Sequence, residues 1–320
     1  MIYFKGGDKM NLELLFGQIV LMFALMLVGV GANKVKFMNE QTASDLTNVL
    51  LYVVSPCLII ESFEKPYSAS RVHALLVSAL GLIVVYGIQI IVSKFVFKKI
   101  KDKNLRRIVE YGSIYSNAGF IGIPIVSSLF GSTGVFYAVV PLALFNIFNW
   151  THGVGLFANE ENAASRLEKL RSVLFNPNII AIFIGLILFV FSIKLPSLLS
   201  QIIDYISSIN TPVSMLVIGN SLANIALKNF KINRSILMSL FLRNLIYPLV
   251  TALVMQSLGL TGNPLSTMIL MMACPVGGMV VLFTLQSRGK QEPALALMGT
   301  STLLSLFTIP AVFLISNLFT

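Results

Sequence analysis

Residues 116–124 read S-N-A-G-F-I-G-I-P, and residues 273–279 read A-C-P-V-G-G-M. Each stretch interrupts a long apolar run with two glycines and a proline. Glycine permits the backbone to leave helical angles, and proline suits the first position of a new helix, where its missing N–H has no helical partner. The two stretches therefore predict two helices that are broken near their middle.

The composition around these breaks is that of a chain whose solvent is a lipid bilayer. Hydrophobic residues make up 56% of the 320 residues, charged residues make up 11%, and the mean hydropathy is +0.85. Soluble domains are far less apolar. Because hydrocarbon offers no partner to backbone N–H and C=O groups, the apolar runs are expected to be helices, and the alternation of barrel strands is missing. We predict an all-α polytopic membrane protein.

Ten apolar runs reach the length of about 20 residues that a helix needs to cross a bilayer. We place them near residues 12–32, 43–63, 71–97, 107–130, 132–157, 177–194, 197–224, 235–258, 263–286 and 293–318. The first run follows Lys5 and Lys9 as a signal peptide would, but we interpret it as the first span. Met10 is an alternative start, which would make residues 1–9 an extension.

Basic residues are distributed unevenly over the connections between these runs. Seventeen Lys and Arg residues follow odd-numbered spans, whereas five follow even-numbered spans or precede the first, and Arg243 lies within a span. Short cytoplasmic loops are enriched in Lys and Arg. We therefore expect both termini on the extracytoplasmic side of the cell membrane. The net charge of +10 has this origin, and we predict no nucleic-acid partner.

An odd number of spans in each half inserts the second half upside down relative to the first, as in an inverted repeat. Pro56 and Pro212 lie 156 residues apart, and Pro124 and Pro275 lie 151 apart, which supports two corresponding halves. We predict a first repeat at residues 1–157, a cytoplasmic linker at 158–176 and a second repeat at 177–320.

Broken helices at mid-membrane are tolerated where they line a cavity. Their free N–H groups and positive dipole ends would favour an anion. The alternative is that both are ordinary proline kinks. The predicted substrate-binding residues, which include two asparagines of the fifth span, are Asn117, Gly119, Gly122, Pro124, Asn146, Asn149, Cys274, Pro275, Gly277 and Gly278.

Ionisable residues within spans are costly and are therefore candidates for a role in coupling. Glu110 lies two helical turns before Asn117, and we expect it to interact with Arg243, unless both reach the membrane interface. Asp204 in the seventh span is a further candidate. We expect no metal site, since Cys57 and Cys274 have no CxxC spacing and no neighbouring His.

The two breaks, Thr211-Pro212 followed by Gly219, and S-T-L-L-S-L-F-T-I-P at residues 301–310 together resemble the auxin efflux carrier family. Its bacterial members include malate and malonate permeases. The resemblance covers essentially the whole chain. It implies ten spans in a 5+5 inverted repeat with a bile-acid-transporter-like fold, in which spans 4 and 9 cross at their prolines.

The same resemblance implies a scaffold of spans 1, 2, 6 and 7, which also forms a homodimer, and a moving transport domain of spans 3–5 and 8–10. Asn117 and Pro124 match the first crossover of the family, and Pro275 with Gly277 matches the second. Plant members have a second crossover asparagine, whereas no Asn stands near Cys274 here. Transfer of auxin itself as the substrate is therefore not implied.

These patterns predict a secondary carrier that moves a small organic anion through the membrane. The chain lacks the phosphate-binding motif of ATPases as well as H-E-x-x-H and Ser/His pairs within spans, so we expect neither an ATP-driven pump nor an enzyme. We expect no cofactor; Na⁺ or H⁺ is the candidate coupling ion. The alternatives are a sodium- or proton-coupled symporter of the bile-acid-transporter fold and a non-transporting membrane sensor.

Overall fold

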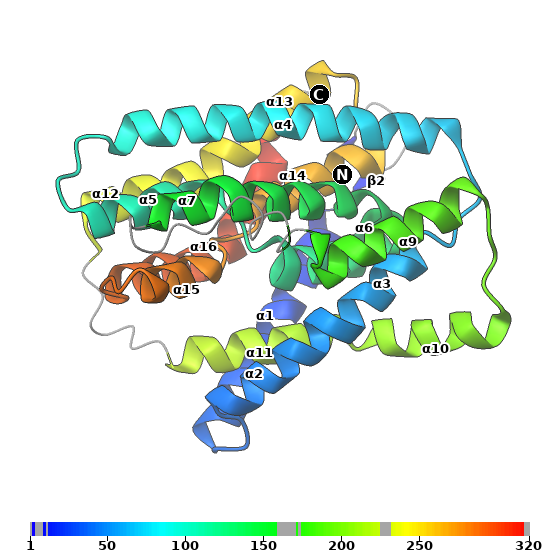
Figure 1. Cartoon of the computed structure of the whole chain (residues 1–320), viewed down its shortest axis with the longest axis horizontal. Coiled ribbons are helices and arrows are strands. Elements are labelled where there is room, and N and C mark those ends of the chain that lie inside the picture. The colour runs from blue at the N-terminus through cyan, green and yellow to red at the C-terminus, as the bar shows by residue number, and fades with distance from the viewer. Residues whose placement is uncertain are drawn as a thin grey trace.

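The fold is that of a helical membrane protein, seen in a computed structural model (Figure 1). The structure describes residues 2–3, 9–10, 12–158, 171, 174–224 and 232–316. Within them the chain is helical, apart from a short antiparallel pairing of β1 (Ile2–Tyr3) with β2 (Lys9–Met10). Seven helical stretches are long and apolar enough to cross a membrane. The prediction of an all-α membrane protein is confirmed at this level.

The first half contains four long helical stretches and one shorter helix. In chain order the elements are α1 (Leu12–Lys34), α2 (Glu40–Val49), the π-helix η1 (Leu50–Val54), α3 (Ser55–Ser62), α4 (Ala69–Phe97), α5 (Lys103–Ile114), the π-helix η2 (Ala118–Gly122), α6 (Ile123–Phe148), the π-helix η3 (Asn149–Gly153) and α7 (Val154–Phe157). Several of these elements follow one another without a break, so that α2, η1 and α3 form one stretch and η2 to α7 form another.

The stretch from residue 118 to residue 157 has 40 residues, about twice the length that a bilayer needs. It is divided by a kink at Gly131, where φ is 57° and ψ is −156°. Residues with a Cβ rarely adopt such a positive φ, so glycine is required at this position. The predicted fourth and fifth spans therefore meet at Gly131, as the predicted boundary at residues 130–132 places them.

The second half also contains whole and broken helices. Its elements are α9 (Pro177–Val190), α10 (Ser197–Ser208), α11 (Asn210–Asn224), α12 (Arg234–Phe241), the π-helix η5 (Leu242–Ile246), α13 (Tyr247–Ser257), α14 (Gly262–Ala273), α15 (Met279–Gln286) and α16 (Glu292–Ser316). The predicted linker at 158–176 falls largely outside the described residues. The predicted sixth span is represented by α9, which is 14 residues long.

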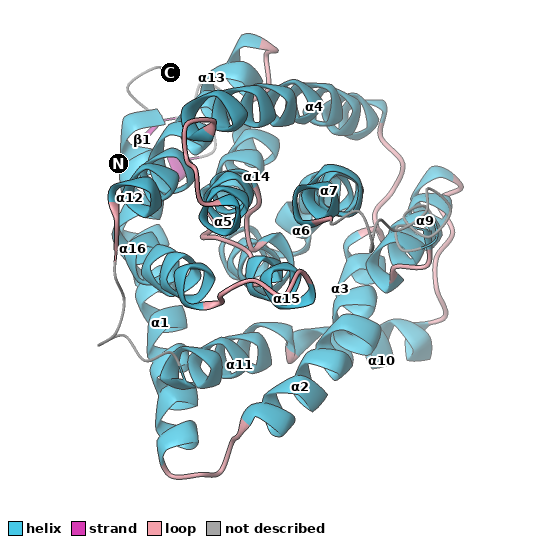
Figure 2. Ribbon diagram, turned by 60° about the vertical axis from the view of Figure 1, so that its left-hand side comes forward, coloured by secondary structure: helices cyan, strands magenta, loops and turns pink. Residues whose placement is uncertain are grey.

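The helices differ in how far other helices cover them. Figure 2 shows α1, α2, α3, α10 and α11 along one edge of the molecule and α5, α14 and α15 within the rest, with α4 and α13 on the opposite side. Every residue of α14 from Leu265 to Ala273 is buried, because α4, α6, α13 and α16 surround it. A helix that is covered on all sides is apolar around its whole circumference, which explains the Met-rich and Leu-rich sequence of α14.

Helix α1 packs closely against α11 through two glycines. A Cβ at Gly219 would overlap the carbonyl oxygen of Met26, and a Cβ at Gly29 would overlap the backbone of Leu216. Small residues allow membrane helices to approach at backbone distance, where packing replaces the missing hydrophobic driving force. Asn33 extends this contact by donating to Asn220 Oδ1 at 2.9 Å.

We predict that Gly219→Ala lowers the melting temperature of the detergent-purified protein, because the new methyl group separates α1 from α11. The expected cost is about 1–3 kcal/mol, typical of an overpacked contact. Gly87→Ala on α4 is the matched control, since a Cβ there meets no atom within 4 Å. Equal melting temperatures for the two variants would contradict the close contact of α1 with α11.

Candidate functional site at the paired helix breaks

The two sequence-predicted breaks lie against each other. Ser116, after α5, forms an isolated antiparallel bridge with Val276, after α14. Asn117 N donates to Pro275 O at 2.7 Å, and Gly277 N donates to Tyr115 O at 3.0 Å. A Cβ at Gly277 would stand 3.1 Å from Ser116 O, so glycine permits this approach. The backbone groups that leave the helices therefore find partners in the other break.

A buried arginine joins the ends of the two broken helices. Arg243 lies on η5 and is 0% exposed. Its guanidinium donates to Ile114 O at 2.6 Å and to Met272 O, two carbonyls at the C-terminal ends of α5 and α14. Such carbonyls lack a partner in their own helix and carry the negative end of the helix dipole. Arg243 is therefore a positive counter-charge that both ends share.

The residue after Arg243 supports the second break. Asn244 Nδ2 donates to Ser301 O at 3.1 Å, and the Ser301 hydroxyl donates to Asn244 Oδ1 at 2.7 Å. The hydroxyl oxygen of Ser301 in turn accepts the N–H of Val276 at 3.0 Å. Arg243 and Asn244 are consecutive residues of η5. One turn of π-helix therefore holds the ends of α5 and α14 through Arg243 and the unwound residue Val276 through Asn244 and Ser301.

A cavity of about 540 Å³ lies beside the breaks. Its lining is mostly apolar and comes from α2, η1, α9 and α11 on one side and from both breaks, α6, η3 and α16 on the other. The polar lining residues, none of which is charged, are Thr47, Tyr52, Ser116, Asn117, Asn146, Asn149, Asn176, Asn178, Ser221 and Thr302, together with the indole of Trp150.

Two helix N-termini reach this cavity. Ala118 and Gly119 begin η2, Gly278 and Met279 begin α15, and all four line the cavity. The first N–H groups of a helix have no intrahelical acceptor and bear its positive dipole end. The side-chain oxygen of Asn117 accepts the N–H of Phe120 at 3.3 Å. The N–H₂ group of Asn117 takes no part in that contact. The arrangement can hold a negatively charged group.

Four asparagines besides Asn117 contribute further polar groups to the cavity. Asn176 Nδ2 donates to Asn146 Oδ1 at 3.1 Å, and Asn149 Oδ1 accepts the Tyr111 hydroxyl at 2.6 Å. Asn178 is 5% exposed, and its Oδ1 has no partner among the described residues. Buried polar atoms without a partner are rare. Asn178 is therefore available to a bound molecule.

Six of the ten predicted binding residues line the cavity: Asn117, Gly119, Asn146, Asn149, Gly277 and Gly278. The other four lie behind it. Gly122 packs against Met271, and Cys274 is buried with its thiol directed at Leu270 O at 3.3 Å. Pro124 and Pro275 present their carbonyls to Thr211 and Asn117. These four residues shape the breaks.

The predicted coupling residues lie apart from one another. The expected pairing of Glu110 with Arg243 is wrong, because Arg243 donates to Ile114 and Met272, whereas Glu110 faces a separate cavity with Lys94 and Arg106. Both residues lie in described parts of the chain. Asp204 is exposed on α10 and does not line the cavity at the breaks.

Several polar residues of the cavity were not predicted from the sequence, and two of them lie at the start of α9. Asn176 and Asn178 flank Pro177 at the start of α9, where the Asn176 side chain accepts the N–H of Asn178 at 3.0 Å. The sequence N-P-N is a helix start signal, because asparagine is a favoured N-cap and proline a favoured first residue. The signal predicts where α9 begins but does not indicate that this end faces a cavity.

Comparison with known proteins gives a consistent result. The sequence pattern of the family described as "membrane transport protein" matches residues 14–313. An uncharacterized transporter of Methanocaldococcus jannaschii is 28% identical over 231 residues, which are 70% of this chain and 73% of that protein. An uncharacterized transporter of Methanothermobacter thermautotrophicus is 22% identical over 296 residues, which are 91% and 95% of the two chains.

We predict that Arg243→Met lowers the stability of the protein, because the carbonyls of Ile114 and Met272 lose their shared donor. Each buried carbonyl left without a partner costs about 1–3 kcal/mol, and removal of the desolvated charge offsets part of this. We expect a net loss of about 2 kcal/mol in thermal unfolding. Arg106→Met, which removes a half-buried arginine of α5, is the control. A stabilised Arg243→Met protein would contradict the assigned role.

Proposed function

The chain belongs to the membrane transport protein family, the family of the auxin efflux carriers, and on this premise we propose that it is a secondary carrier for a small organic anion. The substrate class is a carboxylate such as malate, malonate or an auxin-like acid. The observation that carries the proposal is the convergence of two positive helix ends on a cavity whose described lining residues include no charged side chain.

The electrostatics of the cavity favour an anion over a cation. Two helix N-termini supply partial positive charge, and the amides of Asn117 and Asn149 are neutral donors. Backbone N–H groups at helix ends bind carboxylate and phosphate groups in many proteins. Helix dipoles and neutral amides hold an anion more weakly than a full positive charge does. This weaker hold suits a carrier.

The size of the cavity suits a small acid. A volume of about 540 Å³ falls within the range of about 300–1,000 Å³ that is usual for sites of small molecules. The apolar lining leaves room for the hydrocarbon part of a substrate, while the breaks bind its carboxylate. Malonate and malate would occupy the polar end, and an auxin-like acid would also contact Phe145 and Trp150, which line the cavity.

We propose a ten-span arrangement for this carrier. The seven long helical stretches, with residues 118–157 crossing twice, together with α9 and the broken pair α14 and α15, account for ten crossings. Spans 1, 2, 6 and 7 would form the scaffold, and the remaining spans would form the transport domain. Both termini would then lie outside the cell membrane, in agreement with the distribution of basic residues.

Contacts between these two proposed parts differ on the two sides of the breaks. Ser128 donates to Gln18 Oε1 of α1 at 2.5 Å, and the hydroxyl of Thr211 lies 3.4 Å from Pro124 O. The cavity is instead lined by Thr47, Ser221 and Asn176, near the connections that basic residues assign to the cytoplasm. We infer that the carrier is closed outside and open inside, and that alternating access moves the transport domain along the scaffold.

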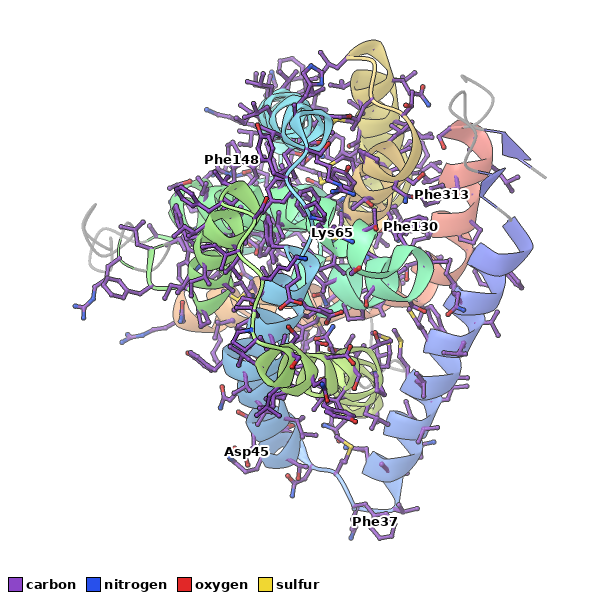
Figure 3. The ribbon with its side chains drawn as sticks, turned by 90° about the vertical axis from the view of Figure 1, so that its right-hand side faces the viewer. Phe37, Asp45, Lys65, Phe130, Phe148 and Phe313 are labelled. Carbon is purple, nitrogen blue, oxygen red and sulfur yellow. The ribbon has the colours of Figure 1, made fainter. Side chains whose placement is uncertain are left out.

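A lysine strengthens the closed outer side. Lys65 Nζ, in the connection from α3 to α4, donates to the hydroxyls of Ser132 and Thr133, each at 3.1 Å. Figure 3 shows Lys65 beside the part of the chain that carries Phe130, remote from Phe37 and Asp45 at the other end of the molecule. Burial, followed by the nearby charge of Arg71, lowers the pKa of Lys65 from its usual value.

Coupling to sodium is the alternative within the same function. Sodium sites of carriers use backbone carbonyls and the C-terminal ends of broken helices. Here the carbonyls of Ile114 and Met272 are occupied by Arg243. No group of three or more His, Cys, Asp or Glu residues that could hold a metal ion occurs among the described residues. These features favour a carrier without a sodium site at the breaks.

We predict that a small carboxylate raises the melting temperature of the purified protein. A ligand at 100 times its dissociation constant stabilises the folded state by about 2.7 kcal/mol, which a thermal-shift assay detects. The screen compares malonate, malate, aromatic acids and bile acids, each with sodium and with choline. A shift with one class identifies the substrate for uptake assays. The absence of any shift in a folded sample would contradict the anion site.

We predict that Asn117→Asp abolishes this carboxylate-dependent shift and the corresponding uptake. Aspartate retains the size of the side chain and can still accept the N–H of Phe120, so the cap of η2 is preserved. Its negative charge repels a carboxylate held by the two helix ends. Asn224→Asp, at the end of α11 and outside the cavity, is the control for added charge. Unchanged uptake by Asn117→Asp would remove the breaks from the mechanism.

A further inference from the structure

A second cavity lies at one end of α4, α5 and α7. It has a volume of about 290 Å³, and its lining residues are Ile90, Lys94, Lys98, Arg106, Glu110, Ile114, His152 and Leu156. None of these residues lines the larger cavity at the breaks. The second cavity is therefore a separate site, for which the proposed carrier function provides no ligand.

The charges of this cavity are unbalanced. Lys94 and Lys98 of α4 and Arg106 of α5 are positive, whereas Glu110 is the one acidic residue of the described lining. Lys94 acts electrostatically on both Glu110 and His152, so these three side chains converge from three elements. With His152 neutral, Glu110 compensates a single charge. The cavity retains an excess of two positive charges and is suited to an anion.

The mouth of the cavity lies at the edge of the membrane. Lys94 and Lys98 are exposed, one helical turn apart, at the end of α4. Ile91 and Phe95 of the same helix are 70% and 68% exposed, as expected of a face directed at lipid. Lys98 Nζ stands 3.7 Å above the ring of Phe95. Basic residues that end a lipid-facing helix lie at the depth of phospholipid headgroups.

Two contacts join this cavity to the paired breaks. Ile114 lines the cavity, and its carbonyl accepts a hydrogen bond from Arg243. His152 also lines the cavity, and its Nδ1 lies 2.9 Å from the hydroxyl of Tyr115, whose backbone carbonyl accepts the N–H of Gly277. An anion bound here would hold α4, α5 and η3 together directly beside the proposed substrate site.

We propose that this cavity binds a phosphate group, with Lys94, Lys98 and Arg106 as its ligands. The phosphate is either the headgroup of an anionic phospholipid or free phosphate at the membrane surface. Arginine binds phosphate through its planar fork of donors, and lysine contributes a point charge. Basic pockets between membrane helices bind lipid headgroups in this manner. The proposal holds whether or not the substrate of the carrier is a carboxylate.

The test measures the melting temperature of the full chain in neutral detergent during titration with phosphatidylglycerol or phosphatidylcholine. A separate titration uses inorganic phosphate against chloride at equal ionic strength. We expect phosphatidylglycerol to raise the melting temperature more than phosphatidylcholine does. Each basic residue near an anionic headgroup contributes about fivefold in affinity, so the double variant Lys94→Gln/Arg106→Gln should bind phosphatidylglycerol roughly 30-fold more weakly.

The double variant Lys99→Gln/Lys101→Gln is the matched control, because it removes the same charge from exposed residues in the connection between α4 and α5 that do not line the cavity. It should keep the wild-type affinity. A response to inorganic phosphate alone, lost in the first variant, assigns the site to the free anion. Equal weakening of both variants, or no response of the wild type to either ligand, overturns the proposal. If the first double variant does not fold, the comparison is repeated with single substitutions of exposed residues. Lys98→Gln is then the test variant and Lys99→Gln its control.

Discussion

The structure depends on one constraint: the backbone groups exposed where two helices are interrupted inside the protein must find hydrogen-bond partners. At each break several N–H and C=O groups lose their helical partners, and an unpaired buried group costs about 1–3 kcal/mol. The breaks satisfy one another through the contacts of Asn117 with Pro275 and of Gly277 with Tyr115. Arg243 satisfies the carbonyl ends. At the starts of η2 and α15 the N–H of Phe120 is paired with Asn117 Oδ1 and the N–H of Val280 with Gly277 O, whereas the residues that precede them, Gly119 and Met279, line the cavity.

This division of partners determines the chemistry of the site. The carbonyl ends of the broken helices are occupied by a side chain of the protein, whereas the N–H ends face an open cavity. Two carbonyl ends that could bind a cation are therefore occupied, whereas the positive ends of η2 and α15 border the cavity. The proposed preference for an anion thus rests partly on the position of Arg243 on η5, although Arg243 does not line the cavity.

The sequence predicts the breaks well because glycine and proline act locally. Gly119, Gly277 and the proline-containing stretches mark where a helix must change direction, and both stretches are broken as predicted. Contacts between residues that lie far apart in the sequence could not be predicted in the same way. Depth in a span indicates how far along a helix Arg243 lies but not which way it points, and its pairing with Glu110 was wrongly predicted for this reason. Asn178 was missed because the packing of α9 beside the cavity is not encoded in its local sequence.

For the proposed carrier, the distribution of contacts indicates which elements would move as a unit. The breaks, η5 and α16 are joined by hydrogen bonds from Arg243, Asn244 and Ser301, so they would move together. The glycine contact of α1 with α11 gives the proposed scaffold its own rigidity. Between the two parts lie the contacts of Ser128 with Gln18, of Thr211 with Pro124 and of Lys65 with Ser132 and Thr133, together with the packing of α3 against α6. In the proposed movement these polar contacts, each worth about 1 kcal/mol, would break while the hydrogen bonds within each part remain.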